Sequence, residues 1–401
     1  MKEKVQSITF GAAFIYLCCY FMKLADFPDI MMLFLGAVLC LIMVVAQREI
    51  RIDLGICFLA VTMISYAVIL YGKRGVITML PYIPLLMYML ANYLSSYCVK
   101  HEKSENKQLQ LIMALTIGYA VHGILNSYMY FAGYVVEGTR RWNDFWTNSV
   151  VPGTQHVIYF LPVFAVLVPM ALNFGKRRWI ALVSIVVAGF FCYASLATRV
   201  RMAFVILAAV LCEQVVLYGI LERQKFVKLL QNKKVWIAGV ILIVSGVGAI
   251  VALKDTALIS NFLESLGRGG GILNNVRFET QRKALQQLFV YPMGGRQMEL
   301  GRSYAHNVWL DMANAAGLIP FTFFVAYTLY TTYELIRVLL KKSVSSELKM
   351  LYVGLYTVFF LYFTVEPALD ASIHYITPWI FVNGMVRGTL KDKAVIVKME
   401  R

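Results

Sequence analysis

A single histidine stands where the chain changes from polar to apolar sequence. Residues 303–310 read "SYAHNVWL", and His306 is one of five histidines in a chain of 401 residues. Imidazole has the unperturbed pKa nearest neutrality of all side chains, so it suits the removal of a proton from a hydroxyl or the orientation of that hydroxyl. We therefore predict that His306 is a catalytic residue.

Three polar residues follow His306 at helical spacing. Asn307, Asp311 and Asn314 lie at i, i+4 and i+7, which places them on one face of a helix that is otherwise apolar. Polar residues in such a helix usually face a cavity or a partner segment. We predict that Asn307 and Asp311 bind substrate; the alternative is that the stripe hydrogen-bonds a neighbouring helix.

Arginine outnumbers lysine in the connecting segments on the side of His306. A planar guanidinium binds phosphate or carboxylate through two hydrogen bonds, whereas lysine suffices as a generic solvated charge. The alternative is that these arginines contact lipid headgroups or loop carboxylates. We predict catalytic roles for Arg277 and Arg199. The arginines predicted to bind substrate are Arg140, Arg141, Arg201, Arg282, Arg296 and Arg302.

The elements that position these residues are apolar segments. Hydrophobic residues make up 60% of the chain and charged residues 15%, against about 25% charged residues in a soluble domain. The apolar runs are about 17–22 residues long, which is the length of a helix that crosses a bilayer, and they do not alternate as barrel strands do. We predict an all-α, polytopic integral membrane protein with about 12 transmembrane helices. The predicted spans are roughly 7–22, 29–46, 52–71, 75–97, 108–131, 155–173, 178–197, 202–221, 235–253, 307–337, 349–365 and 372–390.

The basic residues give this plan an orientation. The net charge is +16, but no basic surface domain exists, so a nucleic-acid partner is not expected. Lysine and arginine instead concentrate in alternate connections, as they do in the cytoplasmic loops of membrane proteins. We predict cytoplasmic N- and C-termini, with His306 and the candidate arginines on the extracytoplasmic face.

Two predicted outer loops are long. One covers residues 132–154 and the other residues 254–305, and long loops of this kind are usually functional or disordered. The second contains helix-compatible apolar spacing, which predicts a short amphipathic helix on the outer membrane face. Its apolar positions are Val276, Ala284, Leu285, Leu288 and Phe289. We thus divide the chain into spans and an outer loop (1–253), a large extracytoplasmic loop (254–305), and the last spans with a cytoplasmic tail (306–401).

Cofactor and metal signatures are missing from the sequence. The seven cysteines lie in or beside apolar runs, so neither a disulfide framework nor a metal site is indicated. There is no phosphate-binding loop, no HExxH and no outer Asp-x-Asp. We expect no cofactor and no metal, and arginine to neutralise any bound diphosphate.

The other histidines are weaker candidates. His156 begins the sixth predicted span, and His374 begins the twelfth, near the outer carboxylate Glu366. His122 and Glu213 lie inside predicted spans. We interpret His122 as a packing contact and Glu213 as a buried, partnered acid.

The block around His306 resembles the signature region of the O-antigen ligase and O-antigen polymerase superfamily. It consists of "VRFETQRKALQQ", "YPMGG" and "AHNVWLDMANAAGLIPF". "SLATRVRMAF" is similar to the family's Ser-Arg turn, with Thr198 in place of the serine and Arg199 as the arginine. "RRWNDFWTNSVVPG" resembles the earlier Arg-to-Gly loop, with Arg140 or Arg141 as the arginine. The matching residues of the main block are Arg277, Pro292, Gly295, His306, Asn307, Leu310, Gly317 and Leu318.

The resemblance implies a GT-C-type glycosyltransferase in the bacterial cytoplasmic membrane. The donor would be a glycan on undecaprenyl diphosphate, which a flippase delivers to the outer face, and the acceptor another glycan or a lipid. Further implied partners are the lipid bilayer and a chain-length regulator. A polymerase of O-antigen or capsule repeat units is favoured over a ligase that joins the glycan to lipid A–core. Alternatives of other classes are a flippase or transporter of the lipid-linked glycan and a non-catalytic scaffold.

Overall fold

The structure is a computed structural model in which nearly all described residues are helical. It describes residues 2–26, 29–74, 81–100, 104–137, 139–233, 276–371, 373–390 and 395–398, together with scattered residues between 236 and 264. Most of the predicted span at 235–253 and the loop segment 265–275, which includes Arg268, lie outside the described residues. The all-α prediction is confirmed.

Long helices build the body of the molecule, and short elements connect them. The long helices are α1 (Lys2–Met22), α2 (Asp29–Gln47), α3 (Leu54–Arg74), α4 (Tyr82–Lys100), α5 (Ser104–Phe131), α7 (Leu161–Leu172), α8 (Phe174–Ala197), α9 (Met202–Leu221), α15 (Leu318–Leu340), α16 (Ser346–Phe363) and α18 (Ile373–Leu390). The shorter helices are η1 (Leu24–Asp26), α6 (Gly153–His156), η3 (Val157–Tyr159), α10 (Arg223–Gln231), α13 (Val276–Gln287), α14 (Val308–Ala316) and α17 (Ala368–Ala371). The strands form two small antiparallel pairs, β1 (Glu49–Ile52) with β4 (Val395–Lys398) and β2 (Arg141–Asn143) with β3 (Val150–Pro152).

Several of these helices have the length and apolar character of membrane spans. Among the described residues, five qualify by both criteria: Asp29–Gln47, Glu105–Phe131, Gly153–Leu172, Gly175–Ala197 and Met202–Leu221. Large apolar side chains on α9 are exposed, among them Val205, Val216 and Ile220. Such exposed apolar surface along a helix is expected where it faces lipid. A membrane protein is therefore indicated, whereas the total of about 12 spans stays a prediction.

The centre of the bundle contains a close contact between α4 and α18. A Cβ atom added at Gly384 would lie 2.4 Å from the carbonyl oxygen of Tyr88, and one added at Gly388 would lie 2.5 Å from that of Asn92. The two glycines are four residues apart and share one helix face, the spacing with which membrane helices bring their backbones together. This contact fixes α18 in the core, where nearly all of its residues are buried.

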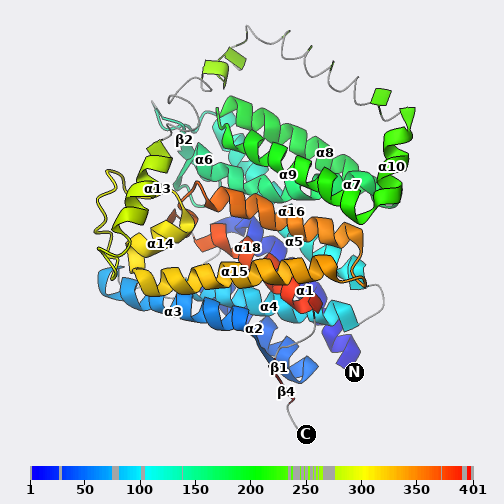
Figure 1. Cartoon of the computed structure of the whole chain (residues 1–401), viewed down its shortest axis with the longest axis horizontal. Helices are drawn as coiled ribbons and strands as arrows, with labels where there is room; N and C mark the ends of the chain where they lie inside the picture. Colours follow the sequence, from blue (N-terminus) through cyan, green and yellow to red (C-terminus); the bar gives the residue numbers. More distant parts are fainter. Residues whose placement is uncertain are drawn as a thin grey trace.

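The bundle has two distinct ends (Figure 1). At one end, which we call the loop end, α6, α13, α14 and the β2–β3 hairpin gather. At the other, which we call the α10 end, the Arg177 guanidinium bonds Asn106 at 2.7 Å, and the Ser346 hydroxyl donates to Glu222 at 2.6 Å. Connections that alternate along the chain therefore meet at the same end, as expected for helices that run back and forth.

The predicted span 307–337 is wrong as a single helix. The structure has two helices there, α14 and α15, which are separated at Gly317 with φ +88°. The reason is packing: a Cβ at Gly317 would lie 2.3 Å from the carbonyl oxygen of Pro292, whose oxygen accepts the backbone N–H of Leu318 at 2.8 Å. The turn 291–295 therefore occupies the space at the break between α14 and α15.

The amphipathic helix predicted in the long loop is present as α13, but its apolar positions are not all on one buried face. Ala284 and Leu288 are buried against the following loop, whereas Leu285 and Phe289 are 56% and 79% exposed. Successive residues of a helix are about 100° apart, so the neighbours of buried positions point elsewhere. Leu288 and Phe289 lie just beyond Gln287, where α13 ends. The helix together with the turn that follows it thus has a buried side and a separate exposed apolar side.

Candidate functional site

The backbone around His306 is held by the helix that follows it. Asn307 is the N-cap of α14, and its side chain accepts the N–H of Leu310 at 3.2 Å. The carboxylate of Asp311 accepts two further backbone donors, Ala305 N–H at 2.6 Å and Asn307 N–H at 3.1 Å. These bonds hold both neighbours of His306 in place. His306 itself has φ +56°, a conformation that costs energy and persists only where the surrounding structure holds it.

The polar stripe on α14 forms hydrogen bonds inside the protein. Asp311 is 1% exposed and Asn314 is 3% exposed. The Asn314 backbone oxygen accepts the N–H of Arg296 at 2.6 Å, so the stripe bonds the loop before α14. The Asp311 carboxylate therefore fixes the loop that carries His306, and the Asn307 side chain caps α14. That these two residues bind substrate stays a prediction. The alternative of hydrogen bonds to a neighbouring helix differs from these contacts, because the partners of Asp311 and Asn314 lie in the loop before α14.

The His306 side chain is half-buried and has an unused nitrogen. Its Nδ1 is buried and has no hydrogen-bond partner among the residues that the structure describes. Burial, followed by the positive charges of Arg277 and Arg302, lowers the pKa of His306 to about 4. The imidazole is therefore neutral at pH 7 and has a ring nitrogen available to accept a proton or a hydrogen bond.

Arg277 and His306 are brought together by α13. The side chain of Gln281, one turn after Arg277, donates to the carbonyl oxygens of His306 at 3.0 Å and Thr364 at 2.8 Å. Arg277 itself is 25% exposed, and its charge acts on His306. The two residues predicted to be catalytic in this block thus share one site at the loop end.

A buried carboxylate anchors Arg277. The Arg277 Nη2 lies 2.8 Å from Glu366 Oε1, and its Nη1 donates to the carbonyl oxygen of Val365 at 3.0 Å. The Thr154 side chain hydrogen-bonds the same carboxylate. Glu366 therefore joins α13, α6 and the turn after α16. From the sequence, Glu366 was expected only as an outer carboxylate near His374. The sequence feature that could have indicated its role is an acidic residue directly after an apolar helix and before a proline.

Arg199 lies in a neighbouring part of the loop end. It occupies the turn between α8 and α9 with φ +57°. The next residue, Val200, packs at Gly153, where a Cβ would lie 3.3 Å from its methyl group. Because Thr154 contacts Glu366, the turn of Arg199 is linked to the Arg277 site through α6. No contact between Arg199 and His306 or Arg277 is found among the described side chains.

The remaining candidate arginines are spread over the surface. Arg140, Arg141, Arg201, Arg282 and Arg302 are exposed. Of these, Arg302 acts electrostatically on His306, whereas Arg282 on α13 acts on Glu279. Arg296 is half-buried, and its guanidinium lies 5.5 Å from the centre of the Tyr304 ring, which is 6.5 Å from the imidazole of His306. Arg302 and Arg296 thus belong to the surroundings of His306. The other four lie on elements of the loop end: the Arg140 carbonyl accepts the backbone N–H of Gly153 at 3.0 Å, Arg141 begins β2, Arg201 precedes α9 and Arg282 lies on α13.

A second buried polar cluster lies beside this site. His122 Nε2 is 2.8 Å from Asp144 Oδ2, and its Nδ1 is 2.6 Å from the carbonyl oxygen of Met22. Burial would raise the pKa of Asp144, but the hydrogen bonds from His122 and Asn126 outweigh it and lower that pKa. The interpretation of His122 as a packing contact is therefore wrong, because its ring hydrogen-bonds the Asp144 carboxylate and the Met22 carbonyl and so fastens loop 132–154 to α5.

The other predicted histidines also have neighbours in the bundle. His156 Nε2 is 3.0 Å from the Ser127 hydroxyl, and the His156 ring lies in an aromatic cluster with Trp142 and Phe160. His374 Nε2 is 2.7 Å from Asp29 Oδ1. These contacts join helices to one another.

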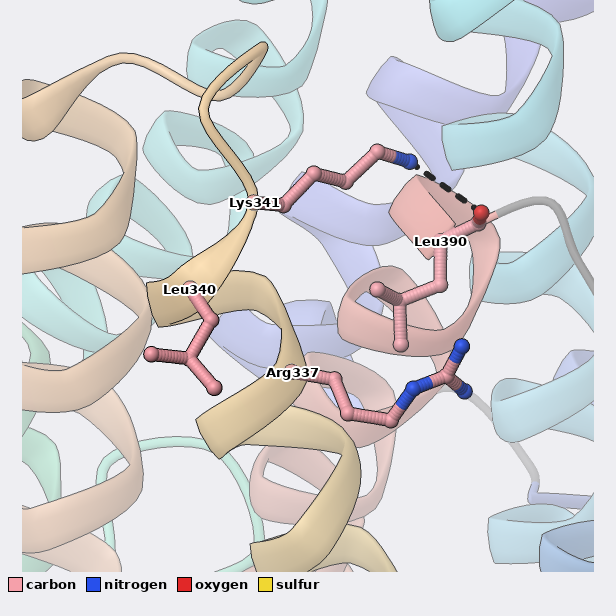
Figure 2. A pocket seen from close by; sticks show the side chains of 4 residues that line it. All are labelled: Arg337, Leu340, Lys341 and Leu390. Carbon is pink, nitrogen blue, oxygen red and sulfur yellow. Dashed lines mark hydrogen bonds between the residues drawn. The ribbon is translucent and has the colours of Figure 1, made fainter.

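The hollow drawn in Figure 2 lies away from the candidate site. It has a volume of about 360 Å³ and is lined by Arg337, Leu340, Lys341 and Leu390, at the α10 end. Lys341 donates to the carbonyl oxygen of Leu390 at 3.1 Å, so it caps the end of α18. Among the described histidines, cysteines and acids, no group of three or more is placed to hold a metal ion.

Comparison with known proteins adds no assignment. No family model matches the chain, and no curated protein shows significant similarity to it. The resemblance to the O-antigen ligase and polymerase superfamily therefore rests on the residue motifs alone.

Proposed function

We propose that the chain is a membrane glycosyltransferase that uses a glycan on undecaprenyl diphosphate as its donor. The observation that carries the proposal is the pairing of a neutral imidazole, His306, with a fixed guanidinium, Arg277. Such a transfer needs one group that accepts a proton and another that stabilises the leaving diphosphate. The motif resemblance supports the same reaction.

The chemistry is a displacement at the anomeric carbon of the donor sugar. The acceptor hydroxyl oxygen forms a bond to that carbon while the bond from the carbon to the diphosphate oxygen breaks. His306 takes or orients the hydroxyl proton, and Arg277 offsets the charge that develops on the departing diphosphate. Arg199 and the other arginines of the loop end supply further positive charge, without a metal ion.

The proposed location is the bacterial cytoplasmic membrane, with the loop end on the extracytoplasmic face. The chain termini would then be cytoplasmic, as the distribution of basic residues favours. Apolar helices beside the loop end would let the prenyl chain stay in the bilayer while its diphosphate reaches Arg277. The proposed acceptor is another repeat unit, which makes the enzyme an O-antigen or capsule polymerase; a ligase that joins the glycan to lipid A–core is the second form.

The test is deletion in the native host, complemented with single variants. Arg277→Ala and His306→Ala should abolish transfer while the protein still inserts in the membrane. Lys283→Ala is the matched control, because it removes a cation from the same helix whose ion pair is with the exposed Glu279, and exposed ion pairs contribute little to stability. Full activity of both site variants would refute the proposal.

The surface glycan of the deletion strain separates the two forms of enzyme. A polymerase deletion loses the long-chain ladder and keeps single repeats. A ligase deletion accumulates long chains on undecaprenyl diphosphate. In either case the wild-type chain must restore the normal surface glycan, and His306→Ala must not.

One observation favours a transporter of the lipid-linked glycan as a second candidate. Arg387 on α18 contacts Glu334 at 3.1 Å and Asp53 at 3.5 Å, and all three side chains are buried between helices. Ionisable groups inside a membrane protein often mark a transport path. A transporter deletion would leave lipid-linked glycan on the cytoplasmic face, inaccessible to an added outer-face glycosidase, whereas an enzyme deletion would leave it accessible.

A further inference from the structure

Glu366 occupies an unusual place for an acid. It lies in the turn between α16 and α17 and is only 2% exposed. Carboxylates are almost never this buried unless they are paired. Its pair is Arg277, which reaches the turn from α13, a helix 79 or more residues earlier in the chain.

The guanidinium is held at two points of the same turn. One nitrogen contacts the Glu366 carboxylate at 2.8 Å, and another donates to the Val365 carbonyl at 3.0 Å. That carbonyl lies two residues beyond Phe363, where α16 ends, and the C-terminal end of a helix favours cations. Arg277 is therefore fixed in orientation, with part of its side chain still exposed.

The carboxylate also sets the net charge that an incoming anion meets. Ionised Glu366 offsets the charge of Arg277, while burial, opposed by Arg277 and the Thr154 hydroxyl, raises the pKa of Glu366. An arginine without this neighbour would attract a diphosphate more strongly and release it more slowly. An arginine without the anchor would be free to take other orientations.

We propose that Glu366 is the positioning residue for Arg277: it holds the guanidinium ready for a prenyl diphosphate and limits how tightly that diphosphate is held. This inference rests on the proposed function, because it takes the diphosphate as the ligand of Arg277. It adds a residue and a property, the tuning of affinity for the leaving group.

The test is binding of radiolabelled farnesyl diphosphate to the full chain in detergent micelles. Glu366→Gln keeps an acceptor for Arg277 but removes the charge, and should lower the Kd about fivefold, the order expected when one like charge within 5–10 Å of an anion is removed. Glu366→Ala removes the anchor as well, and should bind about tenfold more weakly than Glu366→Gln. In an Arg277→Ala background this difference between the two variants should disappear.

Controls separate positioning from folding. Each variant is compared by gel filtration and thermal unfolding, and Glu279→Gln serves as an exposed acid on α13. If Glu366→Ala does not fold, Glu366→Asp replaces it. Aspartate keeps the charge, but its side chain is one methylene too short to hold Arg277 in the same place. The Kd of this variant should therefore also be higher than that of Glu366→Gln. Equal binding by Glu366→Gln and the anchor-deficient variant, or a difference that persists without Arg277, overturns the inference. If the wild-type chain itself does not bind farnesyl diphosphate, the diphosphate assignment in the proposed function falls, and this inference falls with it.

Discussion

The ionisation of His306 predicts an unusual dependence of the reaction on pH. Burial and the charges of Arg277 and Arg302 lower the pKa of this imidazole to about 4. With that pKa, only a very small share of the imidazoles carries a proton at pH 6.5, against about half for an ordinary histidine. If the neutral form is required, kcat/KM should stay flat from neutrality down to about pH 5 and fall only near pH 4.

The variant Arg302→Gln tests whether the charge of Arg302 lowers the pKa of His306. Arg302 is exposed, so water and salt screen its effect on His306, and its removal should move the acid limb of kcat/KM upward by about 0.5 pH unit at low salt. The shift should shrink at high ionic strength, where exposed charges interact weakly. The assay is transfer from a lipid-linked donor by the full chain in proteoliposomes, measured from pH 4 to pH 8 at two salt concentrations.

One control and one outcome make the test decisive. Glu366 is another titrating group of the site, so an acid limb that disappears in Glu366→Gln belongs to Glu366 and not to His306. A limb near pH 6.5 in the wild-type chain, unchanged by Arg302→Gln, would refute the reasoning. The sign for stability follows from the same pKa: because folding disfavours protonation of His306, the site should lose stability as pH falls from about 6.5 to about 4.

Three further predictions concern the support of the site. Asp311→Ala removes the acceptor of two backbone N–H groups and should cost about 3 kcal/mol of folding free energy. The loss should appear as a lower unfolding temperature in detergent, and an unchanged temperature would contradict the role of Asp311 in holding the neighbours of His306. Gly317→Ala meets a carbonyl at 2.3 Å in a left-handed conformation and should cost more than about 2 kcal/mol in the same measurement, whereas stability like that of the wild type would deny the close packing. A photoreactive benzoylphenylalanine in place of Phe289, 79% exposed, should form phospholipid adducts in vesicles, and the same residue in place of the exposed Glu299 should not; crosslinks to protein alone at 289 would show that this surface contacts protein.

The helical elements could be largely predicted from the sequence because their signal is local. Apolar runs gave helices at α1, α2, α5, α8, α9 and α18 with ends within a few residues of the prediction. Spacing likewise predicted α13. The single span at 307–337 failed because the break at Gly317 depends on Pro292, which is distant in sequence but in contact in the fold.

The sequence by itself determined which chemical groups this protein has at hand, and the tertiary structure decided which of them work together. The identity of His306 and Arg277 as a base and a cation follows from their side chains and from the motif that contains both. The lowered pKa of the His306 imidazole, however, comes from burial and from the charges of Arg277 and Arg302, which the spacing of residues along the chain does not reveal.

The role of Asp311 and the partnership of Arg277 with Glu366 were decided only in three dimensions. Asp311 has the spacing of a cavity-lining residue. The loop before α14 folds back over it, however, and the backbone N–H groups of Ala305 and Asn307 hydrogen-bond its carboxylate. Glu366 lies 89 positions after Arg277, and only the packing of α13 on the end of α16 brings the two charges to 2.8 Å. Long-range pairing of this kind depends on how whole helices pack, and that is not encoded in any short stretch of sequence.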